Sequence, residues 1–307
     1  MSMMIQDVFS AAGSNSLGCA SIHSGSKAIS TNCTHPMDSI NALTIQNTQG
    51  VIGKYLVLPP SVVDQVNAVS ADFQMNEGLV SMTINADIAQ VVSDVLWPGT
   101  DVSIIMVLAM IAKVGAPLLA DKAIAPVCDT LLPLAIILTP NIPEAAHFMG
   151  LPPVTTQKDI LAHGRALCAL RLRALLMKGG YLDSEESPDV LITDIGENWF
   201  NVPKVPTKNT HETRCILSAA ITAQIAQSLN LPNATGTPKI YVAAEILQAD
   251  QLYVGSGCAS THNFANLNSY RKLKYETDIF DHRLDPVCIT TCSARSDDLD
   301  VGLVYQS

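Results

Sequence analysis

Residues 103–150 read SIIMVLAMIAKVGAPLLADKAIAPVCDTLLPLAIILTPNIPEAAHFMG. Two apolar segments, 103–112 and 135–139, alternate with two helix-like segments, 122–133 and 142–150. An unbroken apolar segment of this kind is typical of a strand buried on both faces, as in a parallel sheet covered by helices. The stretch therefore predicts an α/β fold with a mostly parallel central sheet and helices on both faces.

The same alternation continues on either side of this stretch, with a small hairpin expected around the turn residues 196–198. We expect further extended segments at 50–59, 174–178, 190–195 and 199–203, and further helices at 61–74, 84–97, 157–172, 216–228 and 239–251. We expect one domain, residues 1–264. Residues 265–307 have mixed charges and no sustained periodicity, so they are expected to form a C-terminal tail of uncertain order.

Composition narrows the class of protein. The chain has 307 residues, 48% of them hydrophobic, which is enough for one large α/β core. Its formal charge of −10 argues against non-specific binding to nucleic acid or to anionic membranes. The first residues lack the basic and apolar regions of a signal peptide, and the longest apolar run, 104–112, is too short for a membrane helix. We therefore expect a cytoplasmic protein.

Eight cysteines are dispersed along the chain, and reduced thiols are the favoured interpretation. Cys288 and Cys292 are four positions apart in the sequence, but no second Cys or His pair with zinc spacing accompanies them, so a metal site there is disfavoured.

The segment 207–220 reads TKNTHETRCILSAA and suggests chemistry at the start of a helix. Backbone N–H groups and the helix dipole make such a start a site for phosphate. Cys215 has two interpretations there. A cysteine followed by Ile-Leu-Ser-Ala-Ala is usually a small buried hydrophobic residue. A cysteine at a helix N-terminus can also form a thiolate that accepts a proton.

Two other motifs carry polar residues at strand ends. Asn141 and Glu144 have a three-residue spacing that places both side chains toward one crevice, although an ordinary helix start has the same pattern. Lys178 ends an apolar strand before Gly179 and Gly180, where it could bind phosphate or simply lie at the surface.

Taken in order, these motifs resemble those of bacterial hydroxymethylpyrimidine (phosphomethylpyrimidine) kinases, from about residue 11 to residue 264. The segments ALTIQNTQGV at 42–51, MKGGYL at 177–182 and VGSG at 254–257 add to the resemblance. It implies a ribokinase-like fold and a homodimer. It also implies transfer of the ATP γ-phosphate, with Mg²⁺, to hydroxymethylpyrimidine and then to its monophosphate in thiamine biosynthesis.

The resemblance also implies roles for individual residues. Cys215 corresponds to the general base, and Glu212, Thr213 and Arg214 to the anion hole. Asn141, Lys178 and Thr210 correspond to the ATP and phosphate site, and Glu144 to the metal site. Gln46, Met82 and Gly25 correspond to positions that contact the pyrimidine.

Several positions depart from the family pattern. Glu212 and Arg214 stand where the family has glycines, and Gly25 and Val107 where it has aspartates. A second reading therefore stays open, a non-catalytic or decayed ribokinase-like protein that retains at most weak binding of pyrimidine or nucleotide. A vitamin B6 kinase is disfavoured by the T-H-x-T-x-C arrangement at 210–215. A Rossmann dehydrogenase is disfavoured because no G-x-G-x-x-G follows a first strand.

Overall fold

The computed structural model describes residues 5–81, 86–96, 102–107, 121–170, 172–210, 213–252, 255–256 and 261. Three predictions fall outside these residues: the roles of Met82 and Glu212, and the tail at 265–307. The boundary between a domain at 1–264 and a tail therefore stays a prediction.

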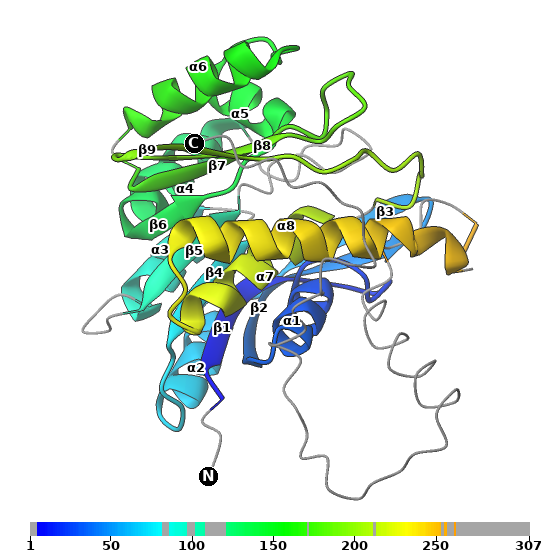
Figure 1. Ribbon diagram of the computed structural model, residues 1–307. Coiled ribbons are helices and arrows are strands. Elements are labelled where there is room, and N and C mark those ends of the chain that lie inside the picture. Colours follow the sequence, from blue (N-terminus) through cyan, green and yellow to red (C-terminus); the bar gives the residue numbers. More distant parts are fainter. Residues whose placement is uncertain are drawn as a thin grey trace, which may run out of the picture.

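The described strands form one nine-stranded sheet in the order β3-β2-β1-β4-β5-β6-β7-β8-β9 (Figure 1). In this spatial order, the six strands β2, β1, β4, β5, β6 and β7 are parallel to one another. The outer strand β3 is antiparallel to β2, β8 is antiparallel to β7, and β9 is antiparallel to β8. The strands are β1 (Asp7–Asn15), β2 (His35–Asn47), β3 (Gly50–Leu56), β4 (Glu77–Ser81), β5 (Ser103–Val107), β6 (Ala135–Leu138), β7 (Ala174–Lys178), β8 (Asp189–Thr193) and β9 (Gly196–Phe200).

Helices cover both faces of this sheet. Helices α1, α7 and α8 pack together on one face, and α2 to α6 cover the other (Figure 1). The α-helices are α1 (Ile22–Thr31), α2 (Pro59–Ser70), α3 (Ala86–Leu96), α4 (Asp121–Leu131), α5 (Ile142–Met149), α6 (Gln157–Cys168), α7 (Thr213–Ala226) and α8 (Leu231–Leu247), with short 3₁₀ turns η1 (Leu132–Leu134) and η2 (Ala249–Gln251).

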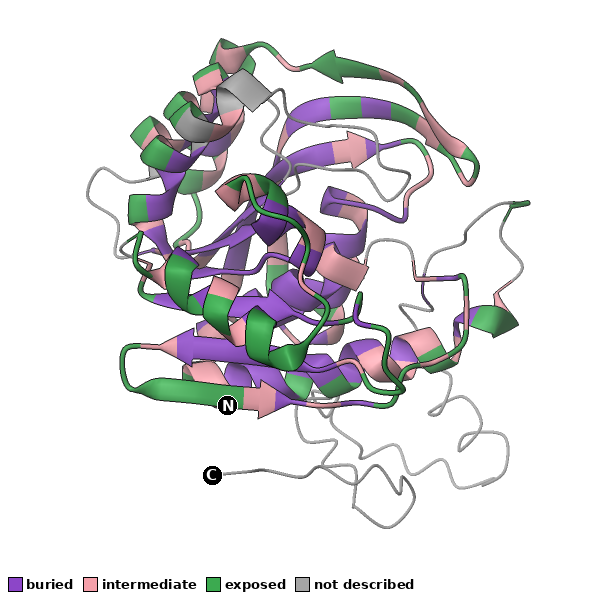
Figure 2. Cartoon of the chain, turned by 90° about the horizontal axis from the view of Figure 1, so that it is seen from above, coloured by how far each residue is buried: buried purple, intermediate pink, exposed green. Residues whose placement is uncertain are grey.

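The two cores share the same strands because successive side chains of a strand point to opposite faces. In β5, Ile104 and Met106 belong to the core beneath α2 to α6, whereas Ile105 and Val107 belong to the core beneath α1, α7 and α8. Figure 2 shows the buried central strands between helices such as α2 and α6, which have buried and exposed residues, whereas α7 has no exposed residue. The predicted mostly parallel sheet with helices on both faces is confirmed.

Two predicted boundaries are wrong for identifiable reasons. The hairpin turns at Asp194 and Ile195, because Thr193 pairs with Gly196, so the polar residues of 196–198 belong to the exposed edge strand β9. Polar side chains are common on edge strands, where one side faces water.

The last predicted helix begins earlier than expected. Its N-cap is Asn230, whose side chain accepts the backbone N–H of Asn233, and Pro238 lies inside the helix. Proline is usually a helix breaker because it lacks an N–H. Here burial of Ala234, Tyr241 and their neighbours against the sheet keeps the helix continuous.

None of the helices in the described part of the chain has both the length and the hydrophobicity needed to cross a bilayer.

Candidate active site

Two strand ends meet at the carboxyl edge of the sheet. β6 leads into Thr139, Pro140 and Asn141, and the neighbouring parallel strand β7 ends at Lys178. The backbone N–H of Lys178 donates to the carbonyl oxygen of Pro140 at 3.0 Å, and Asn141 and Lys178 form a parallel bridge. The sheet therefore holds two of the predicted phosphate-site residues side by side.

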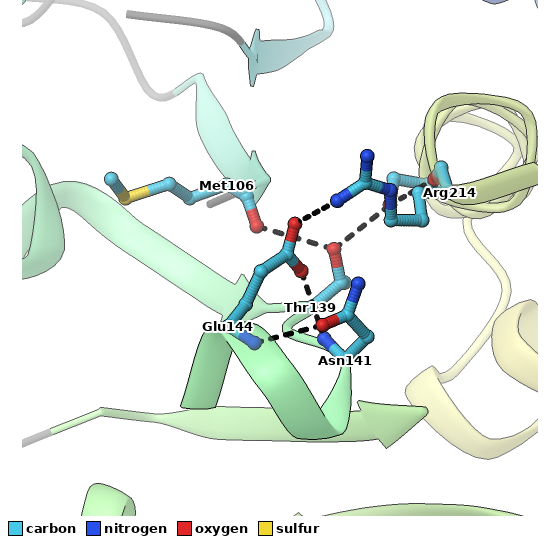
Figure 3. Close-up of polar contacts among 6 residues, drawn as sticks. Met106, Thr139, Asn141, Glu144 and Arg214 are labelled. Atoms are coloured by element: carbon cyan, nitrogen blue, oxygen red, sulfur yellow. Dashed lines mark hydrogen bonds and ion pairs between the residues drawn. The ribbon is translucent and has the colours of Figure 1, made fainter. Parts of the chain in front are cut away.

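Asn141 and Glu144 form a capping box at the start of α5 (Figure 3). The Asn141 side chain accepts the Glu144 backbone N–H at 2.8 Å, and Glu144 Oε2 accepts the Asn141 backbone N–H at 2.9 Å. Such reciprocal bonds satisfy N–H groups that a helix start leaves unpaired. The pair therefore forms the helix start and fixes the buried Glu144 carboxylate in place, while the predicted roles of Asn141 and Glu144 at the phosphate and metal site stay predictions.

The other oxygen of Glu144 is ion-paired with Arg214. The guanidinium of Arg214 donates to Glu144 Oε1, and the Glu144 side chain is 1% exposed while that of Arg214 is 19% exposed (Figure 3). Arg214 is the second residue of α7, so the ion pair joins the N-terminal ends of α5 and α7. Because both charges are largely shielded from water, the contact is far stronger than a surface ion pair.

A second contact links the same two segments. The hydroxyl oxygens of Thr139 and Ser218 lie 2.8 Å apart, and both residues are buried. Ser218 also donates to the backbone carbonyl of Arg214 at 3.0 Å. The first turns of α7 are thus anchored to the loop after β6, which fixes the direction of the helix toward the strand ends.

Lys178 is a buried cation beside this ion pair. Its side-chain nitrogen has no hydrogen-bond partner among the described residues, and the residue is only 7% exposed. Burial lowers the pKa of Lys178 to about 8. The negative charges of Glu144 and Asp189 oppose this shift, whereas the positive charge of Arg214 adds to it. An unpartnered buried amine is costly, and an anion placed beside it would remove that cost.

The turn after Lys178 is held by residues that the sequence analysis did not single out. The Gly179 N–H donates to Asp189 Oδ1 at 2.9 Å, and Asp189 Oδ2 pairs with Lys239 of α8 at 2.7 Å. A Cβ on Gly179 would lie 1.9 Å from the carbonyl oxygen of Pro188, so only glycine fits. A lone lysine within the otherwise apolar stretch of α8 was the available signal for Lys239.

A cavity of about 320 Å³ lies beside these residues, and Asp189 and Lys239 are part of its wall. The predicted phosphate-site residues Asn141, Lys178 and Thr210 contribute to its wall, as do Thr213 and Arg214 from the start of α7. Its other wall is apolar and includes Val202, Val205, Leu217, Val242 and Ile246. The cavity therefore combines a cationic end with an apolar end.

Cys215 lies next to this cavity without lining it. It is the third residue of α7 and is 6% exposed. Its thiol is close enough to Lys178 to affect the charge of that amine. The structure is thus compatible with both interpretations of Cys215. The thiol is buried, as expected for a small hydrophobic residue, and it lies near the cationic end of the site, as expected for a thiolate that accepts a proton.

Two of the three predicted pyrimidine contacts, Gln46 and Gly25, lie elsewhere in the described chain, and the third, Met82, is outside it. Gln46 is the second-last residue of β2, and the Ser16 hydroxyl donates to its backbone carbonyl at 2.8 Å. Gly25 is buried in α1, where an added Cβ would make ordinary contacts of 3.9 Å with Ala219 of α7 and 4.0 Å with Leu79 of β4. Neither residue lines the cavity described above. Their roles stay predictions.

A family model described as phosphomethylpyrimidine kinase matches residues 15–262. The chain is also 37% identical over 253 residues to the hydroxymethylpyrimidine/phosphomethylpyrimidine kinase of Escherichia coli, and the match covers 82% of this chain and 95% of the relative. The chain belongs to the phosphomethylpyrimidine kinase family. The family resemblance predicted from the motifs is therefore confirmed, and with it the assignment to phosphotransferases.

Solved structures agree with this placement. A phosphomethylpyrimidine kinase from Clostridium difficile is 30% identical, with a TM-score of 0.68 over 78% of this chain and 98% of that chain. A pyridoxal kinase from Bacillus subtilis in complex with ADP has a TM-score of 0.79 over 86% of this chain and 99% of that chain, at 21% identity. The second likeness shows the fold alone, which is ribokinase-like as predicted.

The family resemblance assigns Glu144 to a magnesium site, but both oxygens of its carboxylate already have partners in this structure. One carboxylate oxygen is paired with Arg214 and the other with the Asn141 backbone. No group of three or more His, Cys, Asp or Glu side chains that could hold a metal lies within the described residues. Direct coordination of a metal by Glu144 does not fit this arrangement, because the guanidinium occupies the position of the cation.

Proposed function

We propose that this chain transfers the γ-phosphoryl group of ATP to the hydroxymethyl oxygen of 4-amino-5-hydroxymethyl-2-methylpyrimidine, and then phosphorylates the resulting monophosphate, in thiamine biosynthesis. The observation that supports this most directly is Lys178, a buried amine without a hydrogen-bond partner in the described residues. It lines a cavity at the strand ends, beside the start of α7. That combination is the one that phosphoryl transfer needs, namely fixed cations and N–H donors aimed at phosphate oxygens.

The cavity suggests how ATP is oriented. Its apolar wall, with Val202, Val242 and Ile246, is suited to the adenine ring, and its cationic end, with Lys178 and Arg214, to the phosphates. Thr210 and Thr213 lie at that end and provide further polar groups. We infer that the γ-phosphate lies between Lys178 and the first turn of α7, as the predicted roles of Asn141 and Thr210 require.

The transfer itself needs a proton acceptor. The hydroxymethyl oxygen attacks the γ-phosphorus, a new O–P bond forms, and the bond from that phosphorus to the β,γ-bridging oxygen breaks, so ADP leaves. The hydroxyl proton passes to the Cys215 sulfur, the predicted base. A helix N-terminus favours the thiolate form of a cysteine, and Cys215 lies in the first turn of α7.

The remaining predictions concern partners and setting. ATP is the proposed phosphoryl donor. Mg²⁺ is proposed as the ion that ATP carries on its phosphates, since ATP-dependent enzymes usually bind magnesium through substrate phosphates. We further propose a homodimer located in the cytoplasm, and a single kinase domain at residues 1–264. Exposed apolar side chains on β2 and β3 support the dimer.

An ADP-release assay tests the proposed reaction. The purified full chain, given ATP, Mg²⁺ and hydroxymethylpyrimidine, is expected to release ADP only when the pyrimidine is present. Replacing the base, Cys215→Ser, is expected to lower kcat by about 10²–10⁴-fold. Cys128→Ser is the matched control, because Cys128 is another buried cysteine, located on α4.

The assay has a clear contrary outcome. A folded parent chain that releases no ADP in the presence of pyrimidine contradicts the proposed reaction and favours the non-catalytic reading. Equal rates for the parent and Cys215→Ser would leave the reaction in place and remove Cys215 as its base.

A further inference from the structure

The unusual feature of the site is a guanidinium paired with the carboxylate that the family resemblance assigns to the metal site. Glu144 matches the family carboxylate associated with the metal, yet its Oε1 is paired with Arg214 and its Oε2 with the Asn141 backbone. Arg214 stands where the family has glycine, so a glycine at that position could not supply this cation. The ion pair is thus a property of this chain.

The position of Arg214 is set by its neighbours. Glu144 is 1% exposed and is immobilised by its own capping box, so it is a rigid anchor for the guanidinium. The backbone of Arg214 is anchored as well, since its carbonyl accepts the Ser218 hydroxyl at 3.0 Å. A guanidinium has five N–H donors in a planar fork, so it can bind a carboxylate and a phosphate together.

The surrounding charges favour an anion at this place. Among the described residues that line the cavity, Lys178, Lys204, Arg214 and Lys239 are basic and Asp189 is acidic. Asp189 is already paired with Lys239 at 2.7 Å. Glu144 offsets the charge of Arg214 in the same way, so the unbalanced positive charge at the cationic end of the cavity comes from Lys178, whose amine has no hydrogen-bond partner among the described residues.

Building on the proposed function, we propose that Arg214, oriented by Glu144, is the cation that this protein places against the terminal phosphate of the nucleotide, in the position where a carboxylate-held metal would otherwise act. Arg214 is then a phosphate-binding residue and Glu144 its positioning residue. The consequence is that nucleotide affinity depends on Arg214 more than on divalent metal.

Calorimetric titration of the full chain with ATP tests this, once with Mg²⁺ and once with EDTA in place of metal. The parent is expected to bind metal-free ATP with a Kd within about threefold of its value with Mg²⁺. Arg214→Gly, which restores the family residue, is expected to weaken binding of metal-free ATP by about tenfold or more, the usual effect of losing a charge-assisted contact to phosphate. Binding with Mg²⁺ is expected to weaken less.

Two further variants keep the test sound if Arg214→Gly fails to fold. Glu144→Gln/Arg214→Gln removes both charges while keeping similar side-chain shapes, and is expected to lose the same affinity for metal-free ATP. Arg214→Lys keeps a positive charge and is expected to retain part of the affinity for metal-free ATP. Arg165→Gln is the matched control, since Arg165 is 64% exposed and pairs with Glu197 on the surface.

The outcomes separate this inference from the proposed reaction. If Arg214→Gly and the double variant bind metal-free ATP as tightly as the parent, or if the parent requires Mg²⁺ to bind, the inference is wrong even when ADP release occurs. If metal-free binding depends on Arg214 but pyrimidine never triggers ADP release, the inference holds and the proposed reaction fails.

Discussion

Lys178 shows how one side chain can couple binding to pH. Burial lowers the pKa of its amine to about 8, so the amine is charged below that pH and neutral above it. We therefore expect ATP affinity to fall as pH rises through about 8, since a neutral amine no longer attracts phosphate. Titrating ATP into the parent chain from about one unit below to one unit above this pKa measures the effect.

Variants identify the group that causes this pH dependence. Lys178→Met is expected to weaken ATP binding below pH 8 by about tenfold and to flatten the profile, while Lys158→Met on the exposed side of α6 should change neither. The groups that face Lys178 are Glu144, Arg214, Asp189 and Cys215. A profile that persists in Lys178→Met would point to Cys215 instead, and would contradict the assignment.

The same lowered pKa affects stability in a defined direction. The ordinary value is 10.5, so between about pH 8 and 10.5 the unfolded chain binds more protons at Lys178 than the folded chain does. Stability therefore gains from Lys178 as pH rises through this window, and the cost of burying the charged amine is fully present below pH 8. The buried amine weakens the fold at neutral pH, as is common for groups that serve binding.

The sequence predicted which residues lie together at the candidate site better than it predicted their pairings. Asn141, Lys178 and Arg214 were placed in one site by motif order and by family resemblance, and they do lie together. The Arg214–Glu144 pair joins residues 70 positions apart. A charge in a sequence does not reveal its partner, because the partner depends on how α5 and α7 are brought together by the sheet.

At the scale of elements, the turn between β7 and β8 is the tightest packed part of the site. Gly179 lies against the Pro188 carbonyl, where a Cβ would approach to 1.9 Å, and its N–H is held by Asp189. Gly179→Ala must displace this backbone, so we expect it to lower the free energy of unfolding by about 1–3 kcal/mol and to weaken ATP binding. Urea unfolding with a parallel calorimetric titration measures both.

Gly25 on α1 provides a matched control, because the same substitution there is not expected to lower the free energy of unfolding. A Cβ there meets Ala219 and Leu79 only at ordinary contact distance. Because alanine is a better helix former than glycine, Gly25→Ala is expected to be neutral or to stabilise the protein by about 0.5–1 kcal/mol. If both variants had the same unfolding midpoint as the parent, close packing at Gly179 would not be a constraint.

Elements were predictable where local pattern and burial agree. β6 and β7 follow from apolar runs, and the start of α5 from its cap. The start of α8 carries local signals, the N-cap Asn230 and a proline in the first turn, but the prediction missed them because Pro238 inside the helix is a stop signal that burial of the helix overrides. The hairpin turn was displaced by two residues because polar residues mark exposed edge strands as well as turns.

At the scale of the whole molecule, the two ends of the sheet differ. The end formed by β2 and β3 exposes large apolar side chains, with Leu43 at 45%, Ile52 at 74% and Tyr55 at 62% exposure. Leu43 and Tyr55 are cross-strand partners, so they form part of one surface. Clustered exposed apolar side chains on a soluble protein commonly mark an interface.

The proposed homodimer can therefore be tested at that surface. Ile52→Lys places a charge on the exposed edge strand β3 that carries this surface and is expected to convert a dimer to monomers, since an unpaired charge is costly to bury in an interface. Sedimentation equilibrium or light scattering coupled to gel filtration reports the mass.

The opposite edge of the sheet provides the control, because Ile195 in the β8–β9 turn is 91% exposed. Ile195→Lys makes the same chemical change on an isoleucine that is even more exposed, so it should leave the mass unchanged if the interface is formed by β2 and β3. A parent that is already monomeric at all concentrations contradicts the dimer. A mass that falls in Ile195→Lys and not in Ile52→Lys would instead place the interface at the hairpin, and the apolar surface of β2 and β3 would then need another partner.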